Sequence, residues 1–140
     1  MGWGTEANHA EAAKWFRMAS EQDNHEARVH LGYLYEHGLG VGQDKLKALN
    51  LYLATVQKEN AESLYYIGID WEAESTQPND KVMAYLWYRM AAHKGNNQGN
   101  TNCSYLAKSK TGEQILKAKE VSRLLIERYG DVQKKENSSR

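Results

Sequence analysis

The chain has 140 residues, with 18 Lys or Arg against 18 Asp or Glu, so its formal net charge is zero. This length suits one domain with a continuous core, and the charge balance disfavours a nucleic-acid or anionic-membrane surface, which needs a basic excess. No segment approaches the roughly 20 consecutive apolar residues that span a bilayer, and the start has neither the basic nor the apolar part of a secretory signal. We therefore expect a cytoplasmic location, or a periplasmic or secreted one if the chain is trimmed from a longer protein.

A repeat of 36 residues runs through the sequence. The segment 12–19 matches the segment 84–91, 72 residues further on, and a third copy lies halfway between them, around Ala48. Gly32 and Gly68 obey the same spacing. Self-similarity at such a period is typical of stacked supersecondary units that bury a shared core.

Residues that favour helix N-caps recur with the same period at two places in each unit. Asn and Asp side chains accept hydrogen bonds from the unpaired N–H groups of a first helical turn. The first set is Asn24, Asn60 and Asn96, and the second is Asn8, Asp44 and Asp80. Each unit therefore holds two helices, called here the A helix, after the first cap, and the B helix, after the second.

Seven helices follow from the caps and the apolar pattern. In chain order they are 9–22 (B), 25–37 (A), 45–58 (B), 61–73 (A), 81–94 (B), 98–107 (A) and 111–129 (B). They form one repeat domain over 8–130, in which the first B helix is followed by the pairs 25–58, 61–94 and 98–129. Residues 131–140 lack an apolar period and are expected to be a disordered polar tail. The predicted fold is an all-α solenoid of about three and a half α/α-hairpin repeats.

Glycines inside the A helices indicate close helix packing. A mid-helix Gly costs about 1 kcal/mol relative to Ala, so its recurrence at Gly32 and Gly68 suggests that a B helix approaches there. In the third unit Ser104 takes the glycine position, and Cys103 takes a core position that is Leu or Ile in the earlier units. The following link is also about two residues shorter, and a terminal repeat is expected to be atypical in this way.

Three segments resemble the Sel-one-like repeat family, longer relatives of the tetratricopeptide repeat that are best known from bacterial proteins. They are Ala-Glu-Ala-Ala-Lys-Trp-Phe-Arg-Met-Ala at 10–19, Leu-Gly-Tyr-Leu-Tyr-Glu-His-Gly-Leu-Gly-Val at 31–41 and Ala-Tyr-Leu-Trp-Tyr-Arg-Met-Ala-Ala at 84–92. The resemblance covers roughly residues 8–129. It implies a right-handed superhelix of α/α hairpins that acts as an adaptor or scaffold for other proteins.

The resemblance also implies a binding face on the A helices. If these helices line the concave side of the superhelix, the residues beside the core positions point into the groove and bind a segment of a partner protein. The nominated residues are Val29, Tyr33, Glu36, Tyr65, Ile69, Glu72, Thr101, Tyr105 and Lys108. A Tyr-rich strip with an acidic edge suits protein binding. The same tyrosines could instead complete the packing between repeats, and both interpretations stay open at this point.

The sequence predicts neither a metal site nor a catalytic site. His30 and His37 share a helix face but lie two turns apart, too far to chelate one ion, and no paired Cys motif accompanies them. Cys103 is better explained as a buried hydrophobe than as a nucleophile, and Glu36 and Glu72 as rim contacts than as an acid–base pair. We therefore expect no metal, no cofactor and no enzyme activity. Two alternatives to an adaptor stay open, an immunity-type inhibitor of a secreted effector and a hydrolase of the type claimed for cysteine-rich relatives.

The repeat array begins with a B helix that has no A helix before it. An uncovered apolar face around Ala12, Trp15 and Ala19 would associate with another surface. We therefore expect weak self-association through this N-terminal edge, unless residues 1–7, with Trp3, cover it.

Overall fold

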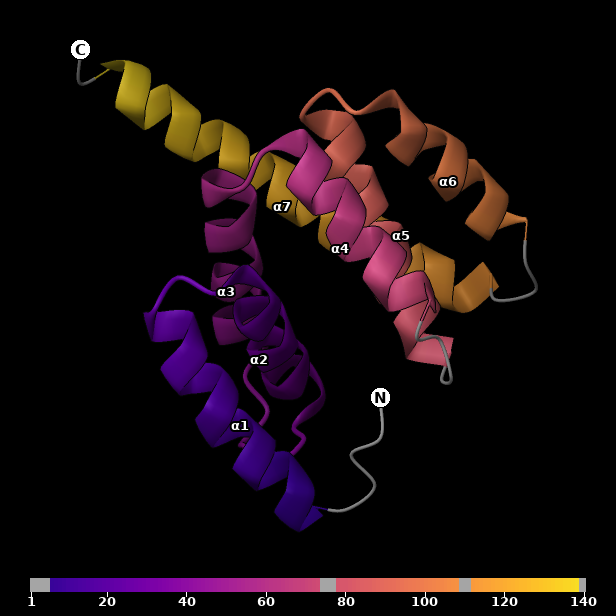
Figure 1. The fold of residues 1–140 in the computed structure, drawn as a ribbon. Helices are drawn as coiled ribbons and strands as arrows, with labels where there is room; N and C mark the ends of the chain where they lie inside the picture. Colours follow the sequence, from indigo (N-terminus) through magenta and orange to yellow (C-terminus); the bar gives the residue numbers. More distant parts are fainter. Residues whose placement is uncertain (1–5, 74–77, 109–111, 139–140) are drawn as a thin grey trace. The chain divides into compact units, whose positions relative to one another are not determined.

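The computed structural model describes residues 6–73, 78–108 and 112–138 (Figure 1). Over these ranges the chain forms seven α-helices and no strand, which confirms the all-α repeat fold. The helices are α1 (Glu6–Glu21), α2 (His25–His37), α3 (Lys45–Lys58), α4 (Ala61–Ala73), α5 (Pro78–His93), α6 (Asn97–Ala107) and α7 (Gly112–Ser138). Within the same ranges, no helix has both the length and the run of apolar residues needed to cross a membrane.

Side-chain caps fix the starts of four helices. In each, a side-chain oxygen accepts a hydrogen bond from the backbone N–H three residues later, as the cap pattern predicts. The capping residues are Asn24, Asn60, Asn96 and Asp44, with donor–acceptor distances of 3.0, 2.8, 3.3 and 3.0 Å respectively. Helices α2, α3 and α4 consequently span the residue ranges expected from the sequence.

The other two predicted caps are wrong. Asn8 lies inside α1, which begins at Glu6, and Asp80 lies in the first turn of α5, which begins at Pro78. A proline is well suited to the first helical position because its fixed φ is already helical and its missing N–H would have had no partner there. In α1, Glu6 and Ala7 favour the helix more strongly than Asn does, so the helix starts ahead of Asn8.

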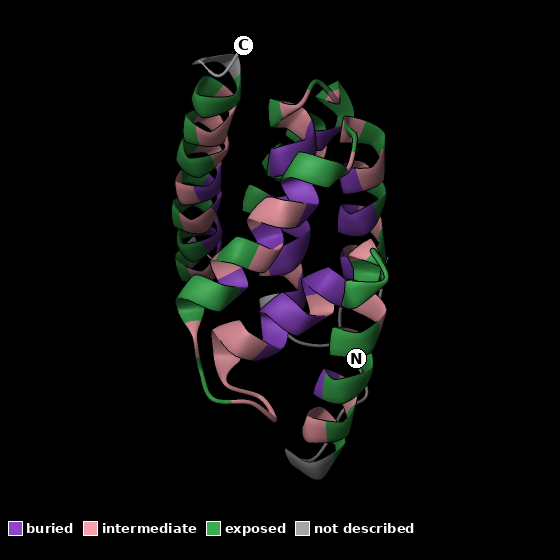
Figure 2. Cartoon of the chain, turned by 90° about the vertical axis from the view of Figure 1, so that its left-hand side faces the viewer, coloured by how far each residue is buried: buried purple, intermediate pink, exposed green. Residues whose placement is uncertain are grey.

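The prediction of a disordered tail is wrong for residues 131–138. Helix α7 continues to Ser138, and only residues 139–140 of that segment lie outside the described residues. The segment contains no proline, and its central residues, 133–136, are Gln, Lys, Lys and Glu, which are all strong helix formers. Once a helix exists, each further residue adds one hydrogen bond without a new nucleation cost. An apolar period is therefore not required for a helix to run on, and this end of α7 is largely exposed (Figure 2).

The described helices fall into two compact units, residues 2–58 and residues 59–140, called here the N-terminal and C-terminal units. In the N-terminal unit α2 packs against both α1 and α3 (Figure 1). Gly38 caps the C-terminus of α2, and its left-handed backbone (φ 66°, ψ 42°) lets its N–H donate to the carbonyl of Leu34. A glycine in this conformation is a common helix C-cap, and it turns the chain back towards α3.

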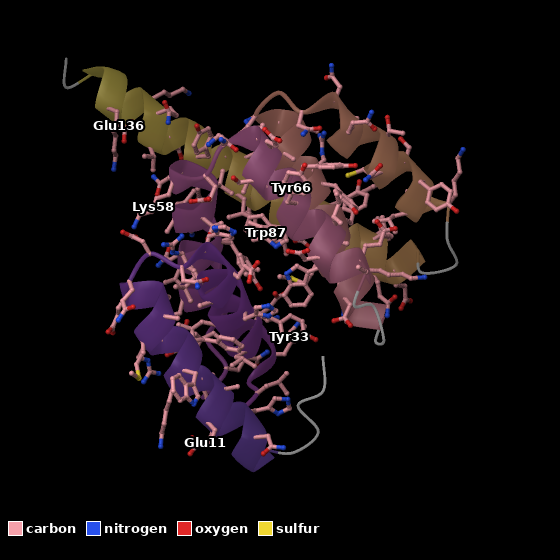
Figure 3. The ribbon with its side chains drawn as sticks, viewed as in Figure 1. Glu11, Tyr33, Lys58, Tyr66, Trp87 and Glu136 are labelled. Atoms are coloured by element: carbon pink, nitrogen blue, oxygen red, sulfur yellow. The ribbon has the colours of Figure 1, made fainter. Side chains whose placement is uncertain are left out.

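Helix α5 is the central element of the C-terminal unit. It packs against α4, α6 and α7, and every residue from Met83 to Ala91 except Arg89 is buried. Trp87 is completely buried (Figure 3). A helix that is apolar almost all round is expected where neighbours cover it on several sides. Arg89 is the one exposed residue in this run.

The first two complete hairpins are closed in the same way. A Cβ added to Gly32 would lie 2.5 Å from Cε1 of Tyr52, and one added to Gly68 would lie 2.5 Å from Cδ1 of Tyr88. No side chain larger than hydrogen fits there without displacing the ring. The predicted close approach of the two helices at these glycines is therefore confirmed.

Candidate functional site

Two of the nine residues nominated for the binding face are unavailable to a partner. Val29 has no exposed surface and Tyr33 is buried, with its ring centroid 4.5 Å from that of His37. The reason is that α2 is covered on two sides by α1 and α3, so little of it faces solvent. The assignment of Val29 and Tyr33 to an open groove is wrong, and for them the packing interpretation holds.

The two recurring acids have a structural role inside their hairpins. The hydroxyl of Tyr52 donates a hydrogen bond to Oε1 of Glu36 at 2.7 Å, and the hydroxyl of Tyr88 donates one to Oε1 of Glu72. Each tyrosine of a B helix therefore packs its ring over the glycine of the preceding A helix, and its hydroxyl binds the glutamate of that A helix. We call this set of contacts the Gly–Tyr–Glu closure. Glu36 and Glu72 recur because this Gly–Tyr–Glu closure recurs, and both remain partly exposed.

Burial and the adjacent carboxylate act together on these two tyrosines. Burial is the larger cause, and both effects raise the pKa of Tyr52 and of Tyr88 well above the ordinary value. The hydroxyls therefore stay protonated as donors at neutral pH. Neither pair is poised to exchange a proton there, which agrees with a structural rather than a catalytic role.

Four of the five remaining nominated residues form a strip on α4 and α6 of the C-terminal unit. Tyr65 and Ile69 on α4 are partly exposed, and their repeat equivalents on α6, Thr101 and Tyr105, are exposed, Tyr105 by 75%. The hydroxyl of Tyr65 accepts a hydrogen bond from Nδ2 of Asn102 at 3.1 Å, which ties α4 to α6. We call these four residues the A-helix strip.

Two further residues border the A-helix strip. Lys108 is exposed just after α6 and is the ninth nominated residue. Tyr66 on α4 is 54% exposed, and its side chain is shown in Figure 3. Tyr66 is not among the nine nominated residues, and its repeat equivalent in α2 is His30. The adjacent Tyr65–Tyr66 pair in the sequence was the available signal.

A trough lies between α5, α6 and α7, where the third hairpin lacks the closure found in the other two. Helix α6 makes little contact with α7, whereas α2 packs along α3 and α4 along α5. Ser104 stands at the glycine position and Lys108 at the glutamate position. When Ala118 is aligned with Ala84, Ser122 stands where the tyrosine is expected. The large ring that fills the gap elsewhere is therefore a small hydroxymethyl group, and the helices stay apart.

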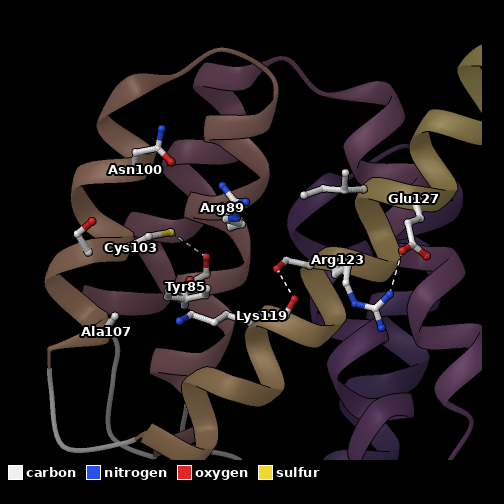
Figure 4. Close-up of a pocket in the computed structure, with 11 residues that line it drawn as sticks. Tyr85, Arg89, Asn100, Cys103, Ala107, Lys119, Arg123 and Glu127 are labelled. Atoms are coloured by element: carbon white, nitrogen blue, oxygen red, sulfur yellow. Dashed lines mark hydrogen bonds and ion pairs between the residues drawn. The ribbon is translucent and has the colours of Figure 1, made fainter.

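The trough has a volume of about 710 Å³ (Figure 4). Helix α6 contributes Asn100, Cys103, Ser104 and Ala107, helix α7 contributes Lys119, Ser122, Arg123, Ile126 and Glu127, and helix α5 contributes Tyr85 and Arg89. This volume is within the range of ligand-binding cavities. Ser104 at the glycine position is visible in the sequence, but it does not by itself predict the trough, because the matching loss of the tyrosine at Ser122 is visible only after the shortened link is taken into account.

Arg89 sets the charge at the base of the trough. Cys103 is buried, its thiol donates to the carbonyl of Tyr85 at 3.5 Å, and burial raises the pKa of the thiol to about 11. Burial likewise raises the pKa of Tyr85, and the cation of Arg89 partly opposes both shifts. Both groups are neutral at pH 7, so the charge here comes from the arginine. Cys103 is a core residue, as predicted.

The histidines nominated and rejected as metal ligands have packing partners. The ring of His30 is stacked on Phe16, with centroids 5.1 Å apart, and His37 lies against Tyr33. In the part of the chain that the structure describes, no group of three or more His, Cys, Asp or Glu side chains is arranged to hold a metal ion.

The described residues therefore define an α/α-hairpin repeat protein with an exposed A-helix strip and a trough at its third hairpin. The chain belongs to the Sel1 repeat family, whose model matches residues 1–24, 25–55 and 61–96. Proteins built from these repeats generally act as scaffolds for protein–protein interactions. The matched segments end before α6, so the trough is formed largely by the part of the chain that departs from the repeat.

Three relatives show the same repeat over part of their length. A putative sel1-like repeat-containing protein of Acanthamoeba polyphaga mimivirus is 41% identical over 51 residues, 36% of this chain. Two ERAD-associated E3 ubiquitin-protein ligase components of Arabidopsis thaliana, HRD3B and HRD3A, are each 36% identical, over 55% and 63% of this chain. The chain spans only 9%, 13% and 11% of these three relatives, in that order.

Proposed function

We propose that this chain binds a segment of a partner protein on the A-helix strip of its C-terminal unit. The observation that carries the proposal is the exposure of large apolar and aromatic side chains at repeat-equivalent positions of α4 and α6, above all Tyr105 at 75%. A tyrosine supplies a large contact area at a small entropic cost and suits a protein interface. Membership of a family of interaction scaffolds supports the same function.

The strip is suited to binding because the surrounding structure holds it in place. The ring of Tyr65 lies 5.5 Å from that of Tyr88, between centroids, and its hydroxyl is bound by Asn102. Tyr88 is in turn held by Glu72. A preorganised aromatic side chain loses little freedom when a partner binds, which favours affinity.

The test is a selection of peptides from a random eight-residue library displayed on phage, with the whole chain as bait. Clones that bind the wild-type chain are then measured against Tyr105→Ala and Thr101→Ala. Leu116→Ala is the matched control, because Leu116 is exposed by 64% but lies on α7, which carries none of the strip residues. We expect a class of clones that loses most of its binding to Tyr105→Ala and none to Leu116→Ala. A selection in which every clone binds Tyr105→Ala as well as it binds the wild-type chain would refute the assignment.

We propose a second, weaker interaction through α1. Trp15 and Met18 are exposed by 67% and 57%, although Trp87, the repeat equivalent of Trp15, is completely buried. Two large apolar residues three positions apart on one helix face suit burial against another copy of the chain. Sedimentation equilibrium checks this, since Trp15→Glu should weaken any concentration-dependent association. A wild-type chain that stays monomeric at millimolar concentration would contradict it.

A further inference from the structure

Two walls of the trough between α5, α6 and α7 run along α6 and α7. The α6 residues that line it, from Asn100 to Ala107, follow the helical spacing of a single face, and so do the α7 residues from Lys119 to Glu127. At 1.5 Å per residue, each wall is about 10–12 Å long. An extended peptide rises about 3.3 Å per residue, so three or four residues of such a peptide match this length.

The trough carries an excess of positive charge. Arg89, Lys119 and Arg123 line it together with a single acid, Glu127. Arg123 donates to Glu127 at 2.9 Å, and both side chains are about 60% exposed, so this pair is weak and open to exchange. Neither Arg89 nor Lys119 has a carboxylate partner among the residues that the structure describes. Two cations are therefore available to a ligand, Arg89 on α5 and Lys119 on α7.

The distribution of these cations favours a chain over a single small anion. Arg89 comes from α5, and Lys119 and Arg123 lie one turn apart on α7, so the positive charge comes from two helices and extends over a turn of α7. The opposite wall offers the polar groups of Asn100 and Ser104, with Ala107 beside them. A ligand with several carboxylates along its length can meet each cation in turn, and its backbone amides can pair with the polar wall.

We propose that the trough binds an extended acidic peptide segment of a partner protein, with carboxylates meeting Arg89 and Lys119. This site deepens the proposed function by naming the chemistry of a partner. It uses residues that are not part of the A-helix strip, so the two proposals can succeed or fail separately.

The experiment uses the same phage-displayed library and the whole chain. Clones selected on the wild-type chain are tested against Arg89→Gln, Lys119→Gln and the double variant, and the winning peptides are synthesised for fluorescence-polarisation titrations. Lys117→Gln is the matched control, because Lys117 is exposed on α7 only two residues from Lys119 but does not line the trough. All substituted side chains are exposed, and circular dichroism shows whether each variant keeps the wild-type helix content.

We expect a class of peptides rich in Asp and Glu whose affinity falls about fivefold with each single variant and more with the double variant. Their binding should weaken as NaCl is raised, because exposed charge pairs are screened. Lys117→Gln and Tyr105→Ala should leave this class unchanged. The proposal is overturned if no selected peptide depends on Arg89 or Lys119, or if the dependent peptides are not acidic. It is also overturned if citrate or inorganic phosphate displaces the peptides at micromolar concentration, since the trough would then be a small-anion site.

Discussion

The closure of the second hairpin gives a quantitative prediction for Gly68→Ala. On helix propensity alone, this substitution would stabilise α4 by about 1 kcal/mol. The structure predicts the opposite sign, because the new Cβ would lie 2.5, 2.7 and 3.1 Å from Cδ1, Cε1 and Cγ of Tyr88. Overpacking of a core typically costs about 1–3 kcal/mol. The ring cannot move aside, since it is fully buried and its hydroxyl is bound by Glu72, so the cost falls in the upper part of this range.

The net effect is a loss of about 1–2 kcal/mol of unfolding free energy, which corresponds to a fall in Tm of roughly 2–8 °C. Urea unfolding followed by tryptophan fluorescence and a thermal scan measure both quantities. Ser104→Ala is the matched control, because Ser104 occupies the same repeat position without a tyrosine above it, and it should change stability by no more than about 0.5 kcal/mol.

A double variant separates the steric cost from other causes. In a Tyr88→Ala background the clash is gone, so adding Gly68→Ala should now stabilise the chain by about 1 kcal/mol, as propensity alone predicts. The reasoning is refuted if Gly68→Ala stabilises the wild-type chain, or if its penalty persists after the ring is removed.

Three further predictions follow from burial. Tyrosines ionise near pH 10.0 in the unfolded chain, whereas burial and the adjacent acids raise the pKa of Tyr52 and Tyr88 in the folded chain. Their contribution to stability is thus complete below that pH and is lost as the pH rises towards the folded pKa. The double variant Tyr52→Phe with Tyr88→Phe lacks these ionisable groups, so its unfolding free energy should fall less than that of the wild type above about pH 10. Denaturant titrations at a series of pH values measure this difference. The pKa of about 11 for Cys103, against 9.0 for an unperturbed thiol, should make its alkylation by iodoacetamide about 100-fold slower than that of free cysteine at pH 8, and similar rates would show that the thiol is accessible. Trp87→Ala should cost about 3–5 kcal/mol and Trp15→Ala less than about 1 kcal/mol, because only Trp87 is buried, and equal losses in calorimetry would contradict the burial difference.

Much of the fold could be predicted because the same capping and packing residues recur with a period of 36 residues. The caps at Asn24, Asn60 and Asn96 and the glycines at Gly32 and Gly68 agreed on one register, and the structure has a helix start or a close approach at each. Propensity and capping are local, so they can be recognised in the sequence.

The candidate site was less predictable because exposure depends on neighbours. Val29 and Tyr65 occupy the same repeat position, yet the first is fully buried and the second is not. The trough exists because Ser122 stands where the other hairpins have a tyrosine, so no ring fills the space between the helices. The sequence gives the identity of Ser122, but it does not show which neighbouring residues leave that space unfilled. The helical end of α7 was missed for a different reason, since its stability comes from propensity without an apolar face.

The Gly–Tyr–Glu closure also bears on how the chain is made. The hydroxyl of Tyr52 and the carboxylate of Glu36 are separated by only 16 residues, and the same separation holds for Tyr88 and Glu72. Contacts between residues so near in the sequence form quickly, and they do not require distant parts of the chain. A ribosome that has released one hairpin has therefore released all the residues needed to lock it, and each hairpin can fold during synthesis before the next one emerges.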